Sequence, residues 1–125
     1  MRVLTVVEDD PDVQFLIECV FSPDSRFQVT GMASSAEDGL ELARTNEPGI
    51  IVLDHGLAGT LTGIAAAPLL KNVAPQSNII LFTADAELRR KAEAEPAIDA
   101  FLLKTESAQL LAIAQRLAGF GPRSV

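Results

Sequence analysis

The stretch that decides the fold is Ile50-Ile51-Val52-Leu53-Asp54, four apolar residues followed at once by an acid. A short apolar run without alternating polar residues is typical of a strand that is buried on both faces of a parallel sheet. Four other short runs rich in apolar residues surround it in the sequence, over residues 3–7, 27–32, 79–82 and 100–103. The sequence therefore predicts five strands, of which residues 50–53 form the third.

Segments with helical periodicity separate these strands. Two of them place apolar or small residues at i, i+3, i+4 and i+7, which marks one buried helix face in each: Val13, Leu16, Ile17 and Val20 in the first, and Ala36, Gly39, Leu40 and Ala43 in the second. The alternation of strands and helices predicts an α/β fold of the (βα)5 type, a doubly wound five-stranded parallel sheet.

The helix boundaries follow from capping residues and prolines. A third helix is expected to bury Leu69, Leu70 and Val73, with Pro68 either in its first turn or bending it. Four polar residues stand where helix N-caps are expected, namely Asp10, Ser35, Asp85 and Ser107.

Length and charge limit the function classes. The chain has 125 residues, which suits one domain over residues 1–121 with a short tail over 122–125. Its 10 basic against 17 acidic residues give a net charge of −7, which disfavours direct binding to nucleic acid. The single Cys19 allows no internal disulfide, and no apolar run is long enough for a signal peptide or a membrane span. We expect a cytoplasmic protein without a membrane partner.

The residues that directly follow the strands carry the candidate chemistry. Right-handed crossovers bring the carboxyl ends of parallel strands to one edge of the sheet, where ligands of open α/β folds bind. The residues at this edge are acids, a hydroxyl and an amine: Glu8, Asp9, Asp10, Asp54, Thr83 and Lys104. Asp10 precedes Pro11 and suits a helix N-cap better than a metal ligand.

Crowded carboxylates stay ionised mainly when a cation compensates them. With oxygen ligands alone, Mg²⁺ is the ion that fits best. A carboxylate beside Mg²⁺ can attack phosphorus, while a hydroxyl and an ammonium stabilise the transferred group. These residue types therefore predict a site for an aspartyl phosphate.

Four stretches at successive strand ends carry a family resemblance: Val6-Val7-Glu8-Asp9-Asp10-Pro11, Val52-Leu53-Asp54, Phe82-Thr83-Ala84 and Phe101-Leu102-Leu103-Lys104. Together they resemble the receiver domain of two-component response regulators over essentially the whole chain. The resemblance implies a flavodoxin-like strand order 2-1-3-4-5. It also implies phosphorelay signalling that a histidine kinase or a histidine phosphotransfer protein drives, with an effector protein downstream and homodimerisation as an option.

The resemblance also assigns roles to single residues. Asp54 resembles the phosphoacceptor, with Thr83 and Lys104 contacting the phosphoryl group. The Mg²⁺ ligands would be Asp9, Asp54, the carbonyl of Gly56 and, through water, Glu8. Phe101 stands where the family has an aromatic switch residue that turns inward with Thr83. The output face would be formed by the fourth helix, the fifth strand and the fifth helix.

The chain departs from the family pattern in three places. The loop over residues 56–63 is rich in glycine and has Ala58 where proline is usual. Thr105 follows Lys104 where the family often has a proline, commonly with a cis bond before it. His55, the only histidine, could tune attack on the acyl phosphate, perturb Asp54 when protonated, or project away along the strand. The last reading is favoured because neighbouring strand residues point to opposite faces.

Three other functions compete with a phosphorylated receiver. A receiver-like interaction domain that acts without phosphorylation would need none of the acidic site. A phosphohydrolase with an aspartyl nucleophile would need a second Asp two residues later, where this chain has Gly56. A flavin module would need a phosphate loop after the first strand, where this chain has acids. We therefore expect no enzyme for an external substrate, only autocatalysed phosphoryl transfer and dephosphorylation.

Overall fold

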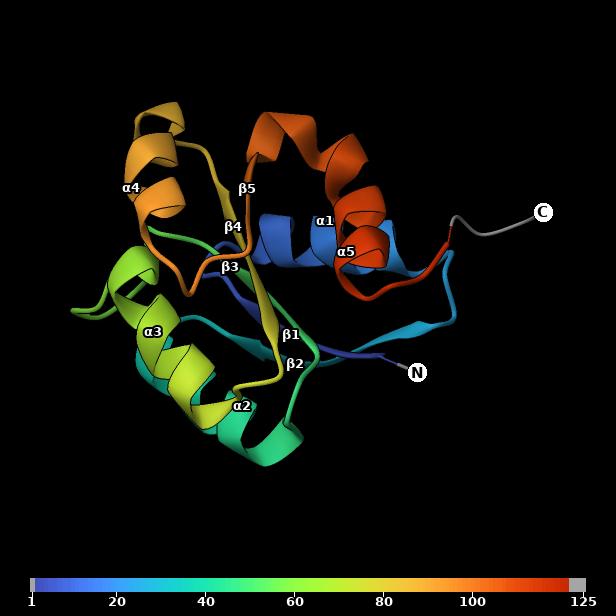
Figure 1. Ribbon diagram of the computed structural model, residues 1–125, viewed down its shortest axis with the longest axis horizontal. Helices are drawn as coiled ribbons and strands as arrows, with labels where there is room; N and C mark the ends of the chain where they lie inside the picture. Colours follow the sequence, from blue (N-terminus) through green and yellow to red (C-terminus); the bar gives the residue numbers. More distant parts are fainter. Residues whose placement is uncertain (1, 122–125) are drawn as a thin grey trace.

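The computed structural model describes residues 2–121 as a five-stranded parallel sheet with helices on both faces (Figure 1). The strand order is β2-β1-β3-β4-β5, as the resemblance implied. The strands are β1 (Arg2–Val7), β2 (Phe27–Ala33), β3 (Ile50–Leu53), β4 (Asn78–Thr83) and β5 (Ala100–Leu103). The helices are α1 (Pro11–Phe21), α2 (Ala36–Asn46), α3 (Gly63–Val73), η1 (Ala86–Leu88), α4 (Arg89–Ala94), η2 (Lys104–Gln109) and α5 (Leu110–Leu117). The predicted tail over residues 122–125 lies outside the described residues.

The central strand β3 shows why the sheet is covered on both sides. Its side chains alternate between two apolar clusters, and all four are buried. Ile51 and Leu53 pack with α2, α3 and α4, whereas Ile50 and Val52 pack with α1 and α5. Figure 1 shows these two helical layers on opposite sides of the sheet. Within residues 2–121, no helix is long and apolar enough to cross a membrane.

Capping side chains begin the first two helices as the sequence predicts. The Asp10 carboxylate accepts a hydrogen bond from the N–H of Asp12, and Pro11 follows at the first helical position. The Ser35 hydroxyl accepts one from the N–H of Asp38 at the start of α2. Asp85 caps η1, which leads directly into α4.

Three expectations about the helices were wrong, those for Leu16, Leu69 and Ser107. Leu16 and Leu69, expected in the buried faces, are 37% and 44% exposed, because α1 and α3 contact the sheet along narrower stripes than the apolar pattern covers. Pro68 lies inside α3 beyond its first turn, so of the two alternatives for this residue a bend in the helix stays the prediction. Ser107 caps no helix, because η2 already begins at Lys104, and α5 follows it after non-helical backbone at Glu106.

A buried ionic cluster ties the chain together at the sheet edge opposite the strand carboxyl ends. Asp24 is 1% exposed and receives hydrogen bonds from the guanidinium of Arg26, at 2.8–3.2 Å, and from the amide of Gln115, at 3.0 Å. The Arg26 guanidinium also stacks 4.8 Å from the ring centroid of Phe120. Asp24 therefore links the start of β2 to α5 and to the segment that follows it.

Asp24 makes the stability of the fold depend on pH. The hydrogen bonds from Arg26 hold the pKa of Asp24 far below its ordinary value of 3.8, although burial opposes them. A carboxyl whose pKa is lower in the folded than in the unfolded protein stabilises the fold at pH values above the unfolded pKa. This stabilisation is lost as the pH falls through the folded pKa.

Asp24→Asn is expected to lower the free energy of unfolding, measured in urea near neutral pH, and the difference from the parent should shrink in acid below pH 3.8.

The matched control is Glu41→Gln, which breaks an exposed ion pair with Arg44 and should change little. An Asp24→Asn protein as stable as the parent near neutral pH would contradict the role given to this cluster.

Candidate functional site

The strand ends bring the predicted chemical groups to one edge of the sheet. Glu8 and Asp9 directly follow β1, Asp54 follows β3, Thr83 ends β4, and Lys104 follows β5. The pairing of Val7 with Leu53 in adjacent strands sets β1 and β3 in register at this edge, so the residues after them begin at the same level. The topology therefore gathers these residues from separate parts of the chain.

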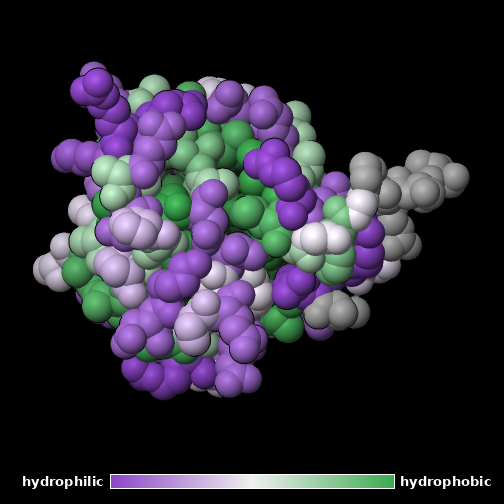
Figure 2. Space-filling model, viewed as in Figure 1, coloured by the Kyte–Doolittle hydropathy of each residue, from purple (hydrophilic) through white to green (hydrophobic). Residues whose placement is uncertain are grey.

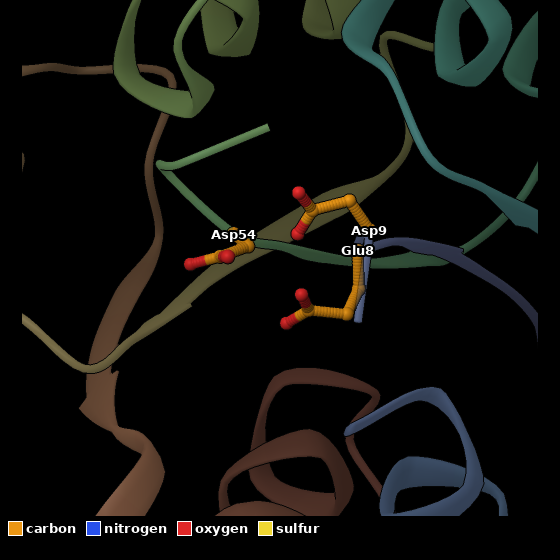
Figure 3. Close-up of side chains that lie close together, drawn as sticks. All are labelled: Glu8, Asp9 and Asp54. Atoms are coloured by element: carbon orange, nitrogen blue, oxygen red, sulfur yellow. The ribbon is translucent and has the colours of Figure 1, made fainter. Parts of the chain in front are cut away.

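Three carboxylates form a tight acidic cluster. Glu8, Asp9 and Asp54 each offer one oxygen, and these oxygens all lie within 4.8 Å of one another. Figure 3 shows Glu8 and Asp9 extending from the end of β1 toward Asp54 at the end of β3. Glu8 and Asp54 are buried, at 1% and 7% exposure, and Asp9 is exposed. The cluster is therefore open to solvent on the side of Asp9.

Lys104 supplies the positive charge that faces two of the carboxylates. Its Nζ lies 2.8 Å from Oε1 of Glu8 and 3.1 Å from Oδ2 of Asp54. Burial alone would lower the pKa of Lys104, but its hydrogen bonds to Glu8 and Asp54 outweigh burial and raise that pKa. Burial also raises the pKa of Glu8, and hydrogen bonds from Lys104 and from the N–H of Asp10 offset only part of that effect.

The backbone around Glu8 is held by a residue that sequence reasoning missed. The side-chain amide of Gln14, one turn into α1, donates a hydrogen bond of 2.6 Å to the carbonyl of Glu8. The N–H of Asp10 donates to Oε2 of Glu8 at 3.1 Å. No periodicity or spacing signal pointed to Gln14, because its role depends on how α1 is angled against the end of β1.

Asp54 lies at one wall of a cavity of about 240 Å³. The carboxylate Oδ1 accepts a hydrogen bond from the N–H of His55 at 2.8 Å, which leaves Oδ2 toward Lys104. Thr83 is buried and lines the same cavity, and its hydroxyl accepts a hydrogen bond from the N–H of Asp85 at 3.3 Å. The other lining residues are His55, Gly56, Ala84, Asp85, Leu88 and Lys104.

Phe101 lies apart from this cavity. Its ring is partly buried against the apolar cluster under α3 and α4, and the guanidinium of Arg89 stacks 4.6 Å from the ring centroid. Figure 2 shows hydrophobic residues gathered between α4 and α5, over β5. The switch residue implied by the resemblance is thus found beside α4, in contact with a cation.

The turn that presents Lys104 differs from the one usual in the family. The described residues contain no cis peptide bond, and η2 begins at Lys104 itself. The Glu106 carboxylate accepts a hydrogen bond of 3.1 Å from the N–H of Leu103, the last residue of the edge strand β5. A side chain therefore fixes this turn where the sequence has Thr105 in place of proline.

The His55 ring does not project freely along the strand. Its Nδ1 accepts a hydrogen bond of 3.4 Å from the N–H of Ile64 in the first turn of α3. The ring is therefore directed toward the start of α3. The ring contacts the helix that the glycine-rich loop leads into.

The chemistry of the donor set fits a hard divalent cation. Every ligand atom offered at the cluster is a carboxylate oxygen, and Asp9 leaves one side accessible. Three carboxylates against one ammonium leave an excess of negative charge for a cation to compensate. The same edge holds a carboxylate, a hydroxyl and an ammonium around one cavity, which are the groups needed to receive and hold a phosphoryl group.

Comparisons with known proteins agree with the fold and indicate a family. The family model described as "Response regulator receiver domain" matches residues 4–115. A protein-glutamate methylesterase/protein-glutamine glutaminase 2 from Paramagnetospirillum magneticum is 33% identical over 76 residues, which cover 61% of this chain and 21% of that protein. The response regulator protein VraR from Staphylococcus saprophyticus is 29% identical over 113 residues, covering 88% of this chain and 53% of that protein. The chain therefore spans about half of the length of VraR and about a fifth of the length of the methylesterase.

A solved structure shows the same fold. The response regulator protein TrrA from Thermotoga maritima, crystallised in complex with Mg²⁺-BeF, aligns with a TM-score of 0.82 at 21% identity. The alignment covers 94% of this chain and 99% of that chain. At this level of identity the likeness establishes the shared architecture.

The backbone behind Asp54 leaves no room for a side chain at Gly63. A Cβ there would collide with the carbonyl oxygen of Asp54 and lie 2.9 Å from Cα of His55. Gly63→Ala is therefore expected to lower the free energy of unfolding by about 1–3 kcal/mol, as overpacking commonly does. Urea denaturation would measure this loss.

Gly56→Ala is the matched control in the same loop. An added Cβ at Gly56 would meet nothing within 4 Å, so its effect should be small. Equal stabilities of the two variants would show that the close approach of α3 to Asp54 is not a constraint on the fold.

Proposed function

Because the chain belongs to the response regulator receiver domain family, we propose that it is a phosphorylation-switched receiver that accepts a phosphoryl group on Asp54. The donor is a histidine kinase or a histidine phosphotransfer protein. The observation that carries this proposal is the position of Lys104, whose ammonium lies 3.1 Å from Oδ2 of Asp54. The Asp54 carboxylate itself lies beside carboxylate oxygens of Glu8 and Asp9. Receiver domains are generally not enzymes for external substrates, and the proposed chemistry acts on the chain itself.

The transfer follows from the groups around Asp54. One carboxylate oxygen of Asp54 attacks phosphorus, a new O–P bond forms, and the bond from phosphorus to the donor nitrogen breaks, with its electron pair leaving on the donor. Lys104 and Thr83 line the same cavity as Asp54, and in this proposal they hold the oxygens of the transferred group. Attack by water on phosphorus later returns free Asp54 and phosphate.

Mg²⁺ would be held by Asp9, Asp54, the carbonyl of Gly56 and, through water, Glu8. When bound, the ion supplies positive charge that offsets repulsion between the carboxylates and the incoming phosphoryl group. Lys104 already forms an ion pair with the buried Glu8, so it remains oriented toward Asp54 before any phosphoryl group arrives. The complex of TrrA with Mg²⁺-BeF supports the choice of ion.

Signalling would pass from the site to a separate effector protein through α4, β5 and α5. In this proposal Thr83 moves onto the phosphoryl group and Phe101 turns inward, which changes the surface that these elements share. Homodimerisation through the same face is one form that this output can take. A cytoplasmic location is part of the same proposal. The esterase activity of the methylesterase relative is not, because the match covers only 21% of that protein.

The test is the intact mass of the protein after incubation with Mg²⁺ and acetyl phosphate. We expect a gain of about 80 Da, the mass of one HPO₃, that is absent in Asp54→Ala and absent when a chelator removes Mg²⁺. Asp38→Ala, which removes an exposed acid of α2 outside the site, should be phosphorylated like the parent.

Lack of any adduct on the parent protein, with Mg²⁺ binding intact, would refute phosphorylation of Asp54. It would favour a receiver-like domain that acts through protein contacts alone. An adduct that persists in Asp54→Ala would place the modified residue elsewhere.

A further inference from the structure

The loop that leads from Asp54 to α3 is closed by hydrogen bonds to His55, near its start. Residues 54–62 separate β3 from α3, and His55 near the start of this segment is hydrogen-bonded to Leu57 within it and to the first two residues of α3. The carbonyl of His55 accepts hydrogen bonds from the N–H of Leu57, at 3.1 Å, and from the N–H of Gly63, at 3.0 Å. The ring nitrogen Nδ1 accepts a third, from the N–H of Ile64 at 3.4 Å. His55 is thus the junction that closes the loop.

The ring completes the N-terminal cap of α3. The first N–H groups of a helix have no partner within the helix and need acceptors from outside. Here the N–H of Gly63 goes to the carbonyl of His55, that of Ile64 to the His55 ring, and that of Ala65 to the Thr62 hydroxyl at 3.3 Å. The cap is therefore shared between Thr62, which directly precedes α3, and His55, which lies at the other end of the loop.

The rest of the loop has few other backbone hydrogen bonds, and its side chains Leu57 and Leu61 pack against the apolar cluster under α2, α3 and α4. The N–H of Ala58 donates to the carbonyl of Ser34 at 3.2 Å, and Ser35 and Ala58 form a single bridge. Gly59 adopts a left-handed φ of 89°, and the position where Gly56 would carry a side chain is open. A glycine-rich loop loses much conformational entropy when it is ordered, so the hydrogen bonds at its ends are needed to hold it in one conformation.

We propose that His55 is a positioning residue whose ring fixes the start of α3 to the end of β3 and thereby holds Gly56 in place at the cavity beside Asp54. The inference rests on the proposed function in one respect, the role of the Gly56 carbonyl as a Mg²⁺ ligand. Any residue at position 55 supplies the two carbonyl bonds. Only a side chain with an acceptor at the place of Nδ1 supplies the third.

The experiment compares His55→Leu with His55→Asn. The asparagine Oδ1 occupies nearly the place of Nδ1 and keeps the acceptor, whereas leucine keeps bulk and removes it. Amide hydrogen exchange of residues 56–64 and the affinity for Mg²⁺ alone, measured by calorimetry, are the two readouts. Urea denaturation checks that each variant is folded.

We expect exchange over residues 56–64 to be about 2- to 10-fold faster in His55→Leu, as loss of one neutral hydrogen bond implies. The Mg²⁺ affinity should fall by a similar factor, and His55→Asn should stay close to the parent in both readouts. Unchanged exchange in His55→Leu, or an Asn variant as perturbed as the Leu variant, would overturn the proposal.

The two readouts also separate this inference from the proposed function. If the parent protein binds no Mg²⁺, the metal role of the site fails, while hydrogen exchange still decides whether the ring fixes the loop. If the parent binds Mg²⁺ and His55→Leu binds it equally well despite faster exchange, the ring does not position Gly56 and the proposal is overturned.

Discussion

The site depends on one constraint, the compensation of crowded carboxylates at the carboxyl ends of neighbouring parallel strands. Two buried carboxylates this close repel each other strongly where water is excluded. Lys104 meets both, at 2.8 Å from Glu8 and 3.1 Å from Asp54. The exposed carboxylate of Asp9 remains beside them, so the cluster keeps an excess of negative charge. The ammonium of Lys104 compensates part of this negative charge, and a bound cation would compensate the rest.

The remainder of the fold serves this arrangement. The strand order puts β3 between β1 and β4, with β5 next to β4, so that acids from β1 and β3 lie near a hydroxyl from β4 and an amine from β5. Gly63 lets α3 approach the backbone of Asp54 directly, and His55 closes the loop between them. At the opposite edge, Asp24 bonds to Arg26 and to Gln115, which fixes the beginning of β2 to α5.

The strands and most of the site could be predicted because each depends on local pattern. The apolar run over residues 50–53 predicts a buried strand, and parallel topology places the residues that follow the strands at one edge of the sheet. The contacts that were missed depend on how separate elements pack against one another, such as Gln115 of α5 with Asp24 and Ile64 of α3 with His55. Helical periodicity gave the direction of a buried face but not its width, which is why Leu16 and Leu69 were misplaced. Ser107 was misplaced because the helical turn begins at Lys104, where no capping residue marks it.

The most direct test of Asp54 as the phosphoacceptor is a crystal structure of the protein with Mg²⁺ and beryllofluoride. We expect beryllium bonded to Asp54, Mg²⁺ ligated by Asp9 and the carbonyl of Gly56, and Lys104 and Thr83 in contact with the fluorine atoms. A structure with Asp54 unmodified and Mg²⁺ absent from the acidic cluster, at concentrations that saturate other receivers, would contradict it.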